Sequence, residues 1–165
     1  MRFELGDDQR AVMASVMTVL ARHAGPARAR QLGGDDPAYD AELEAALDAG
    51  GFLDLAADHD AGPLGAALVV DAVAAAAGVV AVGARALVAP AIGLHEVAAP
   101  VVLAVDGADV PVRFGAAAAT ALVLGDDDVR VVAVDAADVT PVRTRYGYPF
   151  ASIRLGAGQP VDAVP

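Results

Sequence analysis

The stretch Pro100-Val101-Val102-Leu103-Ala104-Val105-Asp106-Gly107 marks the point where the character of the sequence changes. Its apolar run has the length of a strand, and Asp-Gly is a dipeptide typical of tight hairpin turns. Before Pro100, apolar residues recur at helical spacing, whereas short β-branched runs alternate with turn residues after it. This change predicts an α+β fold, with an N-terminal helical domain over residues 1–98 and a small antiparallel β-domain over 99–165.

Short strands separated by turns are expected throughout the second part. The expected strands are 101–105, 110–114, 121–124, 129–134, 139–143 and 150–155. The first two form a hairpin through Asp106-Gly107, and the next two form one through Gly125-Asp126-Asp127-Asp128. Together they predict an antiparallel sheet or partial barrel over about 100–156. Residues 156–165 are expected to form a linker or a frayed end.

Helices are expected over about residues 7–90. They run from Asp7-Asp8 to Gly25-Pro26, from Asp35-Asp36-Pro37 to Gly50-Gly51, from Leu64 to about Gly78, and from Val82 to Val88 with Pro90 as the stop. Asp is a good capping residue, and Pro suits the first helical position. The third segment is apolar nearly all round, which is typical of a helix buried between others.

Two of these helices have clear apolar stripes. The stripe of the first is Val12, Val16, Val19 and Leu20, widened by Met13 and Met17, and that of the second is Tyr39, Leu43, Ala46 and Leu47. After the second helix, Phe52, Leu53 and Leu55 are expected to fill the core as the chain turns.

The composition limits the classes of partner that the chain is expected to bind. Among 165 residues, 56% are hydrophobic but only 4% are aromatic, so the core is made of small side chains. The net charge is −11 and every basic residue is Arg, which argues against nucleic acid and against anionic membrane surfaces. The chain has no Cys, so it has no disulfide, thiolate zinc site or thiol nucleophile.

The N-terminus and the apolar segments bear on localisation. Residues 1–8 show no basic region followed by an apolar run, so no signal peptide is visible. Residues 64–92 are long enough to span a membrane, but Asp71 and Arg85 count against a span. A cytoplasmic protein is expected.

The polar residues nominate no catalytic residue and no metal site. The histidines lack metal-ligand spacing: His23, His59 and His95. Asp58-His59-Asp60 could orient an imidazole or bind a cation, but such clusters are common in loops between helices. Asp126-Asp127-Asp128 lacks the spaced ligands and terminal Glu of a calcium loop, which favours an exposed hairpin tip.

The remaining candidates also have structural explanations. Ser15 and Ser152 lie within expected elements and lack the sharp turn of a nucleophile. Gly33-Gly34 and Gly50-Gly51 fit helix ends rather than phosphate loops. Tyr146-Gly147-Tyr148-Pro149 could contact a planar ligand, although anchoring a loop on the sheet is favoured.

The order of the segments adds a resemblance to acyl-CoA dehydrogenases. In the helical part, the segments that resemble this family are Phe3 to Val12, Tyr39 to Leu43, Leu47 to Leu55, Gly62-Pro63-Leu64-Gly65 and Arg85 to Pro90. The strand part from Arg113-Phe114-Gly115 to Arg143-Thr144, and Tyr146-Gly147-Tyr148-Pro149, resemble the middle β-domain of the family. They cover nearly the whole chain in the order of the family. Membership implies an N-terminal helical domain, a β-domain and a C-terminal four-helix domain, with FAD and an acyl-CoA thioester between them. A C-terminal carboxylate would take the α-proton, and the flavin would take the hydride from the β-carbon.

Two parts of that pattern have no match. The stretch between Pro90 and Arg113 is too short for the strand elements that contact the flavin, and no stretch of these 165 residues matches the C-terminal domain that would carry the base. No catalytic residue is therefore carried over, the cofactor-binding residues are unknown, and this chain alone is expected neither to bind FAD stoichiometrically nor to oxidise acyl-CoA.

Three interpretations follow from the resemblance. The chain could support FAD-dependent dehydrogenation by a second acyl-CoA dehydrogenase-like subunit, in lipid or steroid side-chain catabolism, or be a stand-alone noncatalytic binding or scaffold domain. It could also be a truncated product, because residues 158–161 lie near where the family's chain enters its C-terminal helices. Without that domain the helices over 64–88 and one sheet face would expose apolar surface, so a heteromer is expected, with self-association as the alternative.

Overall fold

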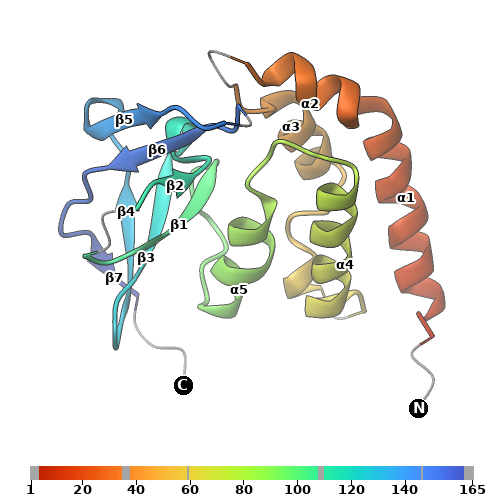
Figure 1. Cartoon of the computed structure of the whole chain (residues 1–165). Coiled ribbons are helices and arrows are strands. Elements are labelled where there is room, and N and C mark those ends of the chain that lie inside the picture. The colour runs from red at the N-terminus through yellow and green to blue at the C-terminus, as the bar shows by residue number, and fades with distance from the viewer. Residues whose placement is uncertain (1–3, 35–37, 59, 108–109, 146, 162–165) are drawn as a thin grey trace.

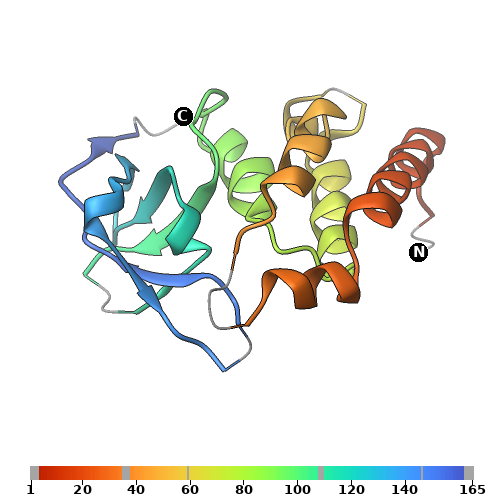
Figure 2. The same ribbon diagram turned by 90° about the horizontal axis from the view of Figure 1, so that it is seen from above.

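A computed structural model describes residues 4–34, 38–58, 60–107, 110–145 and 147–161. The α-helices precede residue 92 and the strands follow residue 100, with short 3-10 turns at Gly115–Ala117 and Ala136–Asp138 among the strands, so the predicted α+β fold is confirmed (Figure 1). Figure 2 shows the helices at one end of the molecule and the strands at the other. The assignment of 1–98 and 99–165 to separate domains stays a prediction.

The helical part has more elements than the sequence predicted. Its elements are α1 (Asp7–His23), α2 (Pro26–Leu32), α3 (Ala41–Ala49), a 3-10 turn (Leu55–Ala57), α4 (Gly62–Ala75), a π-helical turn (Ala84–Val88) and α5 (Ala89–Ala91). α1 ends as predicted, but Pro26 also starts α2, because the first helical position needs no N–H. The predicted start at residues 35–37 lies outside the described residues, and α3 begins after Asp40, which caps it.

The apolar stripes of the sequence form the helical core. Val16 and Leu20 of α1 pack with Leu43 and Leu47 of α3. This cluster also includes Phe52, Leu53, Val69 and Val73, so the stripes and the core role of the segment after α3 are confirmed. α4 packs between α1 and the turns at 55–57 and 84–88, as predicted, but it is not covered on every side, since Leu64 and Asp71 are exposed.

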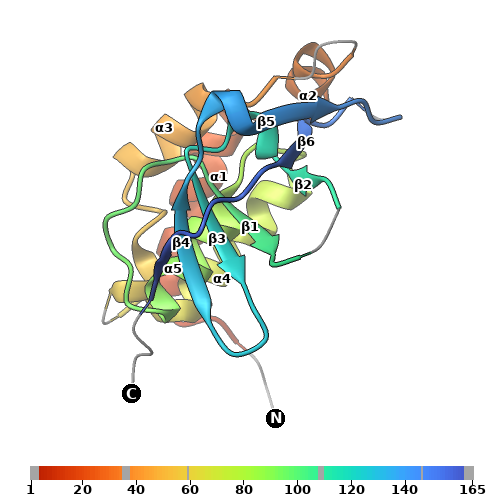
Figure 3. The same cartoon turned by 90° about the vertical axis from the view of Figure 1, so that its left-hand side faces the viewer.

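The strands form two sheets. The strands are β1 (Val101–Val105), β2 (Val112–Arg113), β3 (Thr120–Leu124), β4 (Val129–Ala133), β5 (Val139–Val142), β6 (Phe150–Ile153) and β7 (Gln159–Pro160). One sheet has the order β1-β3-β4-β7 and the other β2-β6-β5, and Figure 3 shows the strands in front of the helices. The predicted β3–β4 hairpin is confirmed, with Leu124 opposite Val129.

The predicted hairpin at Asp106-Gly107 is wrong. β1 runs parallel to β3, with Val101 opposite Thr120, so the first sheet is mixed rather than wholly antiparallel. β2 is only two residues long and pairs with β6 in the other sheet. Pro111 contributes to this outcome, because a residue without an N–H cannot donate to a ladder. The predicted frayed tail is also wrong in part, since β7 pairs with β4.

The two parts of the chain share a core. Val79 and Ala81, which follow α4, pack with Val102, Phe114 and Ala121 of the strand region. No helix among the described residues is long and apolar enough to cross a membrane.

Candidate functional site

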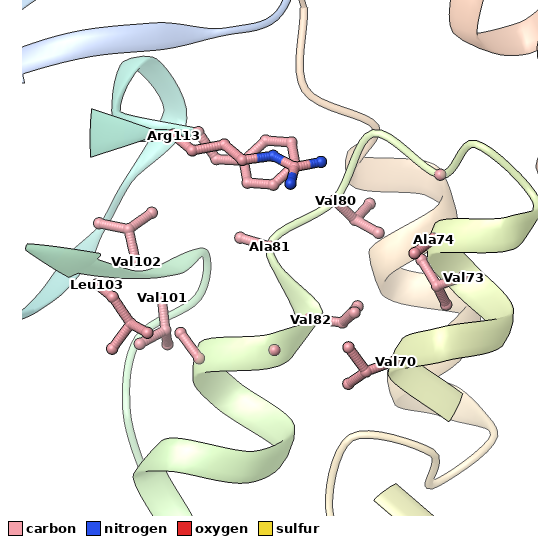
Figure 4. A pocket seen from close by; sticks show the side chains of 14 residues that line it. Val70, Val73, Ala74, Val80, Ala81, Val82, Val101, Val102, Leu103 and Arg113 are labelled. Atoms are coloured by element: carbon pink, nitrogen blue, oxygen red, sulfur yellow. The ribbon is translucent and has the colours of Figure 1, made fainter. Parts of the chain in front are cut away.

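A pocket of about 300 Å³ lies where the helices meet the first sheet. It is lined by Val70, Val73, Ala74, Gly78, Val80, Ala81, Val82, Gly83, Ala84, Val101, Val102, Leu103, Arg113 and Phe114. Figure 4 shows the α4 side chains on one side, β1 on the other, and the segment from Val80 to Val82 between them. Arg113 is the one polar side chain among these residues, so the pocket is apolar with a single cation at its border.

A glycine allows the chain to reverse tightly beside this pocket. A Cβ at Gly78 would lie 2.7 Å from Cγ1 of Val73 and 3.2 Å from Cδ2 of Leu43. Distances below 3 Å force neighbouring atoms to move, so this position requires the smallest residue. The reversal places Val79 and Ala81 against the sheet and Val80 against the helical core.

Aromatic rings hold the guanidinium of Arg113 in place. Its Cζ lies 4.8 Å from the ring centre of Phe114 and 4.7 Å from that of Tyr148, within the range of cation–π contacts. Its Nη2 also donates to the Tyr148 hydroxyl at 3.2 Å. No carboxylate among the described residues lies within ion-pair distance of Arg113. The pocket therefore has an oriented cation that can bind an anionic group.

A buried polar cluster lies behind the pocket wall. The Tyr39 hydroxyl accepts a hydrogen bond from the N–H of Ala81 at 3.1 Å, and its ring packs edge-on against Phe114. Burial raises the pKa of Tyr39, which stays protonated. Glu44 is also buried and its Oε1 has no hydrogen-bond partner among the described residues. Burial raises the pKa of Glu44, although its contacts with Tyr39 and Arg85 oppose the shift.

A second buried carboxylate stabilises the start of α3. Arg28 donates two hydrogen bonds of 2.9 Å to Asp40, whose Oδ1 also accepts from the Leu43 N–H. Burial alone would raise the pKa of Asp40, but the bonds from Arg28 and Leu43 outweigh it and lower the pKa. Arg28 also contacts Glu42 on the surface. Asp40 is therefore ionised and fully engaged, and its role is structural.

The structure does not bring the histidines together. His23 lies 3.5 Å from Glu42, His95 borders a separate hollow near Arg85, and His59 lies outside the described residues. Oδ1 of Asp58 accepts from the N–H groups of Asp60 and Ala61, so this cluster forms the turn before α4. The described residues contain no group of three or more potential metal ligands.

The other predicted candidates also lie in structural positions. Asp126, Asp127 and Asp128 form the exposed tip of the β3–β4 hairpin, as favoured by the sequence. The Ser15 hydroxyl donates to the carbonyl of Ala11 within α1, and Ser152 lies within β6.

The glycine pairs and the aromatic loop are structural as well. Gly33 and Gly50 follow the ends of α2 and α3. In the aromatic loop, Gly147 lies against Gly33 and Gly34, Pro149 is buried and Tyr148 stacks on Arg113, whereas Tyr146 lies outside the described residues. The loop thus anchors the strand region to the helical region, the interpretation favoured from sequence.

Sequence reasoning considered Tyr148, in the aromatic loop, but missed that it meets Arg113, Phe114 and Tyr39 in one site. These residues lie up to 109 positions apart, from 39 to 148, and no local pattern links them. One signal was available, because the four include two of the three Tyr residues in a chain with 4% aromatics. Scarce aromatic residues gather where large flat surfaces are needed.

Comparison with known proteins supports the fold. No family model matches the sequence, and no curated protein matches it. Among solved structures, a chain in the crystal structure of the ChsE4-ChsE5 complex from Mycobacterium tuberculosis matches with a TM-score of 0.62 and 19% identity. The match covers 99% of this chain but 59% of that chain. This chain therefore has a similar fold and spans somewhat more than half of the length of that matched chain.

The pocket residues do not fit FAD by themselves. A flavin dinucleotide needs hydrogen-bond donors around its ring and groups that neutralise its diphosphate. Among the described residues that line the pocket, Arg113 alone has a polar side chain. The pocket volume of about 300 Å³ is also at the lower end for sites that enclose small ligands.

Proposed function

We propose that this chain is a noncatalytic subunit of a heteromeric acyl-CoA dehydrogenase-like complex in the cytoplasm. In this proposal a partner chain carries FAD and the catalytic base, and the complex dehydrogenates an acyl-CoA between its α and β carbons, in lipid or steroid side-chain catabolism. The observation that carries the proposal is the fold similarity, over 99% of this chain, to a chain from a complex of two named components.

Two further observations support this assignment. The order of the segments that resemble acyl-CoA dehydrogenases agrees with a helical part followed by strands. The apolar pocket with one cation does not supply what FAD requires, so the flavin contacts fall to the partner. The partner would also contribute the carboxylate that removes the α-proton.

The experiment is purification of an affinity-tagged full chain from its own cells under native conditions. We expect a flavoprotein to copurify, and the complex to show flavin absorbance and to oxidise acyl-CoA with an artificial electron acceptor. The same chain made alone in a heterologous host is the control, and it should be colourless and inactive. Flavin or activity in the chain alone, or no copurifying flavoprotein, would refute the proposal.

The pocket favours a second candidate, a stand-alone noncatalytic binding or scaffold domain. An apolar cavity with one oriented cation suits a ligand with an apolar body and one anionic group. The fluorescent sulfonate ANS is a suitable probe. Under this candidate the chain alone binds ANS, and Arg113→Gln weakens binding. Arg154→Gln, which changes an exposed arginine just after β6, is the control and should leave ANS binding unchanged.

A further inference from the structure

A hollow of about 320 Å³ lies on the helical region, where the end of α1, α2 and the start of α3 come together (Figure 1). It is lined by Arg22, His23, Ala24, Ala27, Arg28, Gln31 and Glu42. Nitrogen donors supply most of its polar side chains, and Glu42 is the one carboxylate among these residues. This lining differs from that of the apolar pocket beside β1, and it suits an anionic ligand.

Arg28 is held in a fixed orientation beside this hollow. Its Nε and Nη2 donate to Asp40 at 2.9 Å, and Asp40 is 1% exposed. Its Nη1 donates to no described residue. Because a guanidinium is a rigid plane with five N–H donors, fixing one side of it also orients the other. Arg28 therefore brings oriented and unused donors to the hollow that it lines.

Two further donors around the hollow have no partner. The guanidinium of Arg22, in the last turn of α1, forms no hydrogen bond or ion pair with any described residue. The same holds for the side-chain amide of Gln31, in α2. An unpaired guanidinium beside a second, fixed one is an arrangement that binds an anion with several oxygens through charge-assisted hydrogen bonds.

Glu42 occupies the position that such an anion would take. Its Oε1 lies 3.5 Å from Nδ1 of His23, and its Oε2 accepts from Nη2 of Arg28 at 3.3 Å. Both distances exceed the length of strong charge-assisted hydrogen bonds, about 2.7–2.9 Å. The Glu42 side chain is also 67% exposed, and ion pairs of this kind contribute little to stability. Glu42 can therefore turn into solvent at small cost and leave its place to another anion.

We propose that this hollow binds a phosphate dianion, either free or in a phosphomonoester, and that the dianion displaces the carboxylate of Glu42. The donors to its oxygens are the nitrogen-bearing side chains of the lining: Arg22, His23, Arg28 and Gln31. A phosphate has more acceptor oxygens and more charge than the carboxylate that it replaces, so it can accept from α1 and α2 at the same time. This inference does not depend on the proposed function.

The volume favours a phosphate that is attached to a further group. The hollow has about ten times the volume of one water molecule, so a single phosphate ion leaves much of it unfilled. Ala24 and Ala27 supply the apolar part of the lining, against which a short carbon chain can pack. Glycerol 3-phosphate and inorganic phosphate are therefore the two probes, and we expect glycerol 3-phosphate to bind more tightly.

The test is a titration of the nitrogen-15-labelled full chain with each probe, followed through its backbone amide signals. Ionic strength is kept constant, because salt screens exposed charges. We expect saturable shifts centred on residues 22–31 and 42, with a dissociation constant of about 1 mM or lower, as for a few charge-assisted hydrogen bonds at an exposed site. Acetate, which has a single charge and two oxygens, should bind at least about tenfold more weakly.

Two matched arginine variants separate the hollow from the general charge of the chain. Arg22→Gln removes the unpaired cation and should weaken phosphate binding at least about tenfold. Arg30→Gln removes the same charge from an exposed position of α2 that does not line the hollow, because residues two apart lie on different faces of a helix. It should change the affinity less than about twofold. Arg28 is left intact, because it also holds Asp40.

Glu42→Gln tests the displacement. It removes the competing carboxylate, so it should tighten phosphate binding about threefold or more, which a purely structural role of Glu42 would not do. Thermal unfolding verifies that each variant folds. Tighter binding of glycerol 3-phosphate identifies a phosphomonoester as the ligand, and equal binding of the two probes identifies free phosphate.

Four results would overturn the proposal. They are the absence of saturable shifts up to about 20 mM of either probe, acetate binding as tight as that of phosphate, equal losses in Arg22→Gln and Arg30→Gln, and weaker binding in Glu42→Gln.

Discussion

The helical and strand regions bury different kinds of side chains. The helical region buries two carboxylates, Asp40 and Glu44, of which Asp40 is fully paired and Glu44 is not. Among the described strand residues, Thr120 is the one buried polar side chain, and its hydroxyl donates to the carbonyl of Ala98 at 2.7 Å. The stability of the helical region therefore depends on ionisation, whereas that of the strand region depends on apolar packing and backbone ladders.

The two regions nevertheless meet through several contacts. Phe114 packs against both Tyr39 and Tyr148, and Ala81 joins the sheet-side core. The backbone of Gly147 lies directly against that of Gly34. These contacts predict that the two described regions unfold together, although the sequence pattern predicts a domain boundary at residue 98.

The largest effects are expected from matched truncations in the two cores. Leu47 lies in α3 and Leu122 in β3, and both are fully buried. Leu47→Ala and Leu122→Ala should each lower the free energy of unfolding by about 3 kcal/mol, because each removes buried methyl groups and leaves a cavity. Urea unfolding followed by far-UV circular dichroism and by Tyr fluorescence measures both variants.

Comparing the unfolding midpoints from circular dichroism and from Tyr fluorescence shows whether the two regions unfold as one unit. If they unfold cooperatively, each variant shifts both probes to the same midpoint. Leu64→Ala, at an exposed position of α4, is the control and should change stability little. Separate transitions, with Leu122→Ala moving one of them, would show that the regions fold independently.

A smaller effect is expected at the contact between the regions. Gly147 has a φ of 63°, and a Cβ there would lie 2.6 Å from the backbone N of Gly34. Gly147→Ala should cost about 2 kcal/mol, because it adds a backbone displacement to the left-handed strain. Gly107 has a φ of 66°, but a Cβ there would meet no atom of the other described residues within 4 Å, so Gly107→Ala should cost about 1 kcal/mol.

Thermal unfolding of the two alanine variants distinguishes strain from contact. Both variants adopt the same unfavourable backbone region, so the difference between them measures the packing of the 147 loop on residues 33–34. Equal stability losses would mean that this contact does not hold the two regions together.

Local signals predicted the elements well and the pairing of strands poorly. The apolar stripe of α3 and the turn at Gly125 are local, and both were identified. The parallel pairing of β1 with β3 depends on a connection of 14 residues, from 106 to 119, and no dipeptide encodes it. Asp106-Gly107 does form a turn with a positive φ at Gly107, but Pro111 and the short β2 direct the chain into another sheet.

The candidate site was harder to predict than the fold. Phe114 has a φ of 62°, an uncommon conformation for a bulky residue, and the backbone there turns its ring between Tyr39 and Tyr148. Side-chain identity alone does not indicate such a turn. Glu44 was also missed, since a Glu in the first turn of a helix ordinarily faces solvent.

The smallest predicted effect concerns the buried carboxylate of Glu44, which makes the stability of the helical region depend on pH. The folded-state pKa of Glu44 is raised, mainly by burial, so the folded chain retains a proton that the unfolded chain has already lost. The stability from Glu44 is therefore fully present below its ordinary pKa and is lost as the pH rises through the raised value. Glu44→Gln mimics the protonated side chain and removes this loss.

We expect Glu44→Gln to exceed the wild type in stability by about 1 kcal/mol at pH 7, because it removes a charge from a site where Oε1 has no partner among the described residues. The difference should shrink toward zero near pH 4, where Glu44 itself is protonated. Urea unfolding from pH 4 to pH 8 measures this trend, with Glu96→Gln at an exposed position as the control. A Gln variant less stable than the wild type at pH 7 would show that Tyr39 and Arg85 together stabilise the ionised form more than burial opposes it, because both lower the pKa of Glu44.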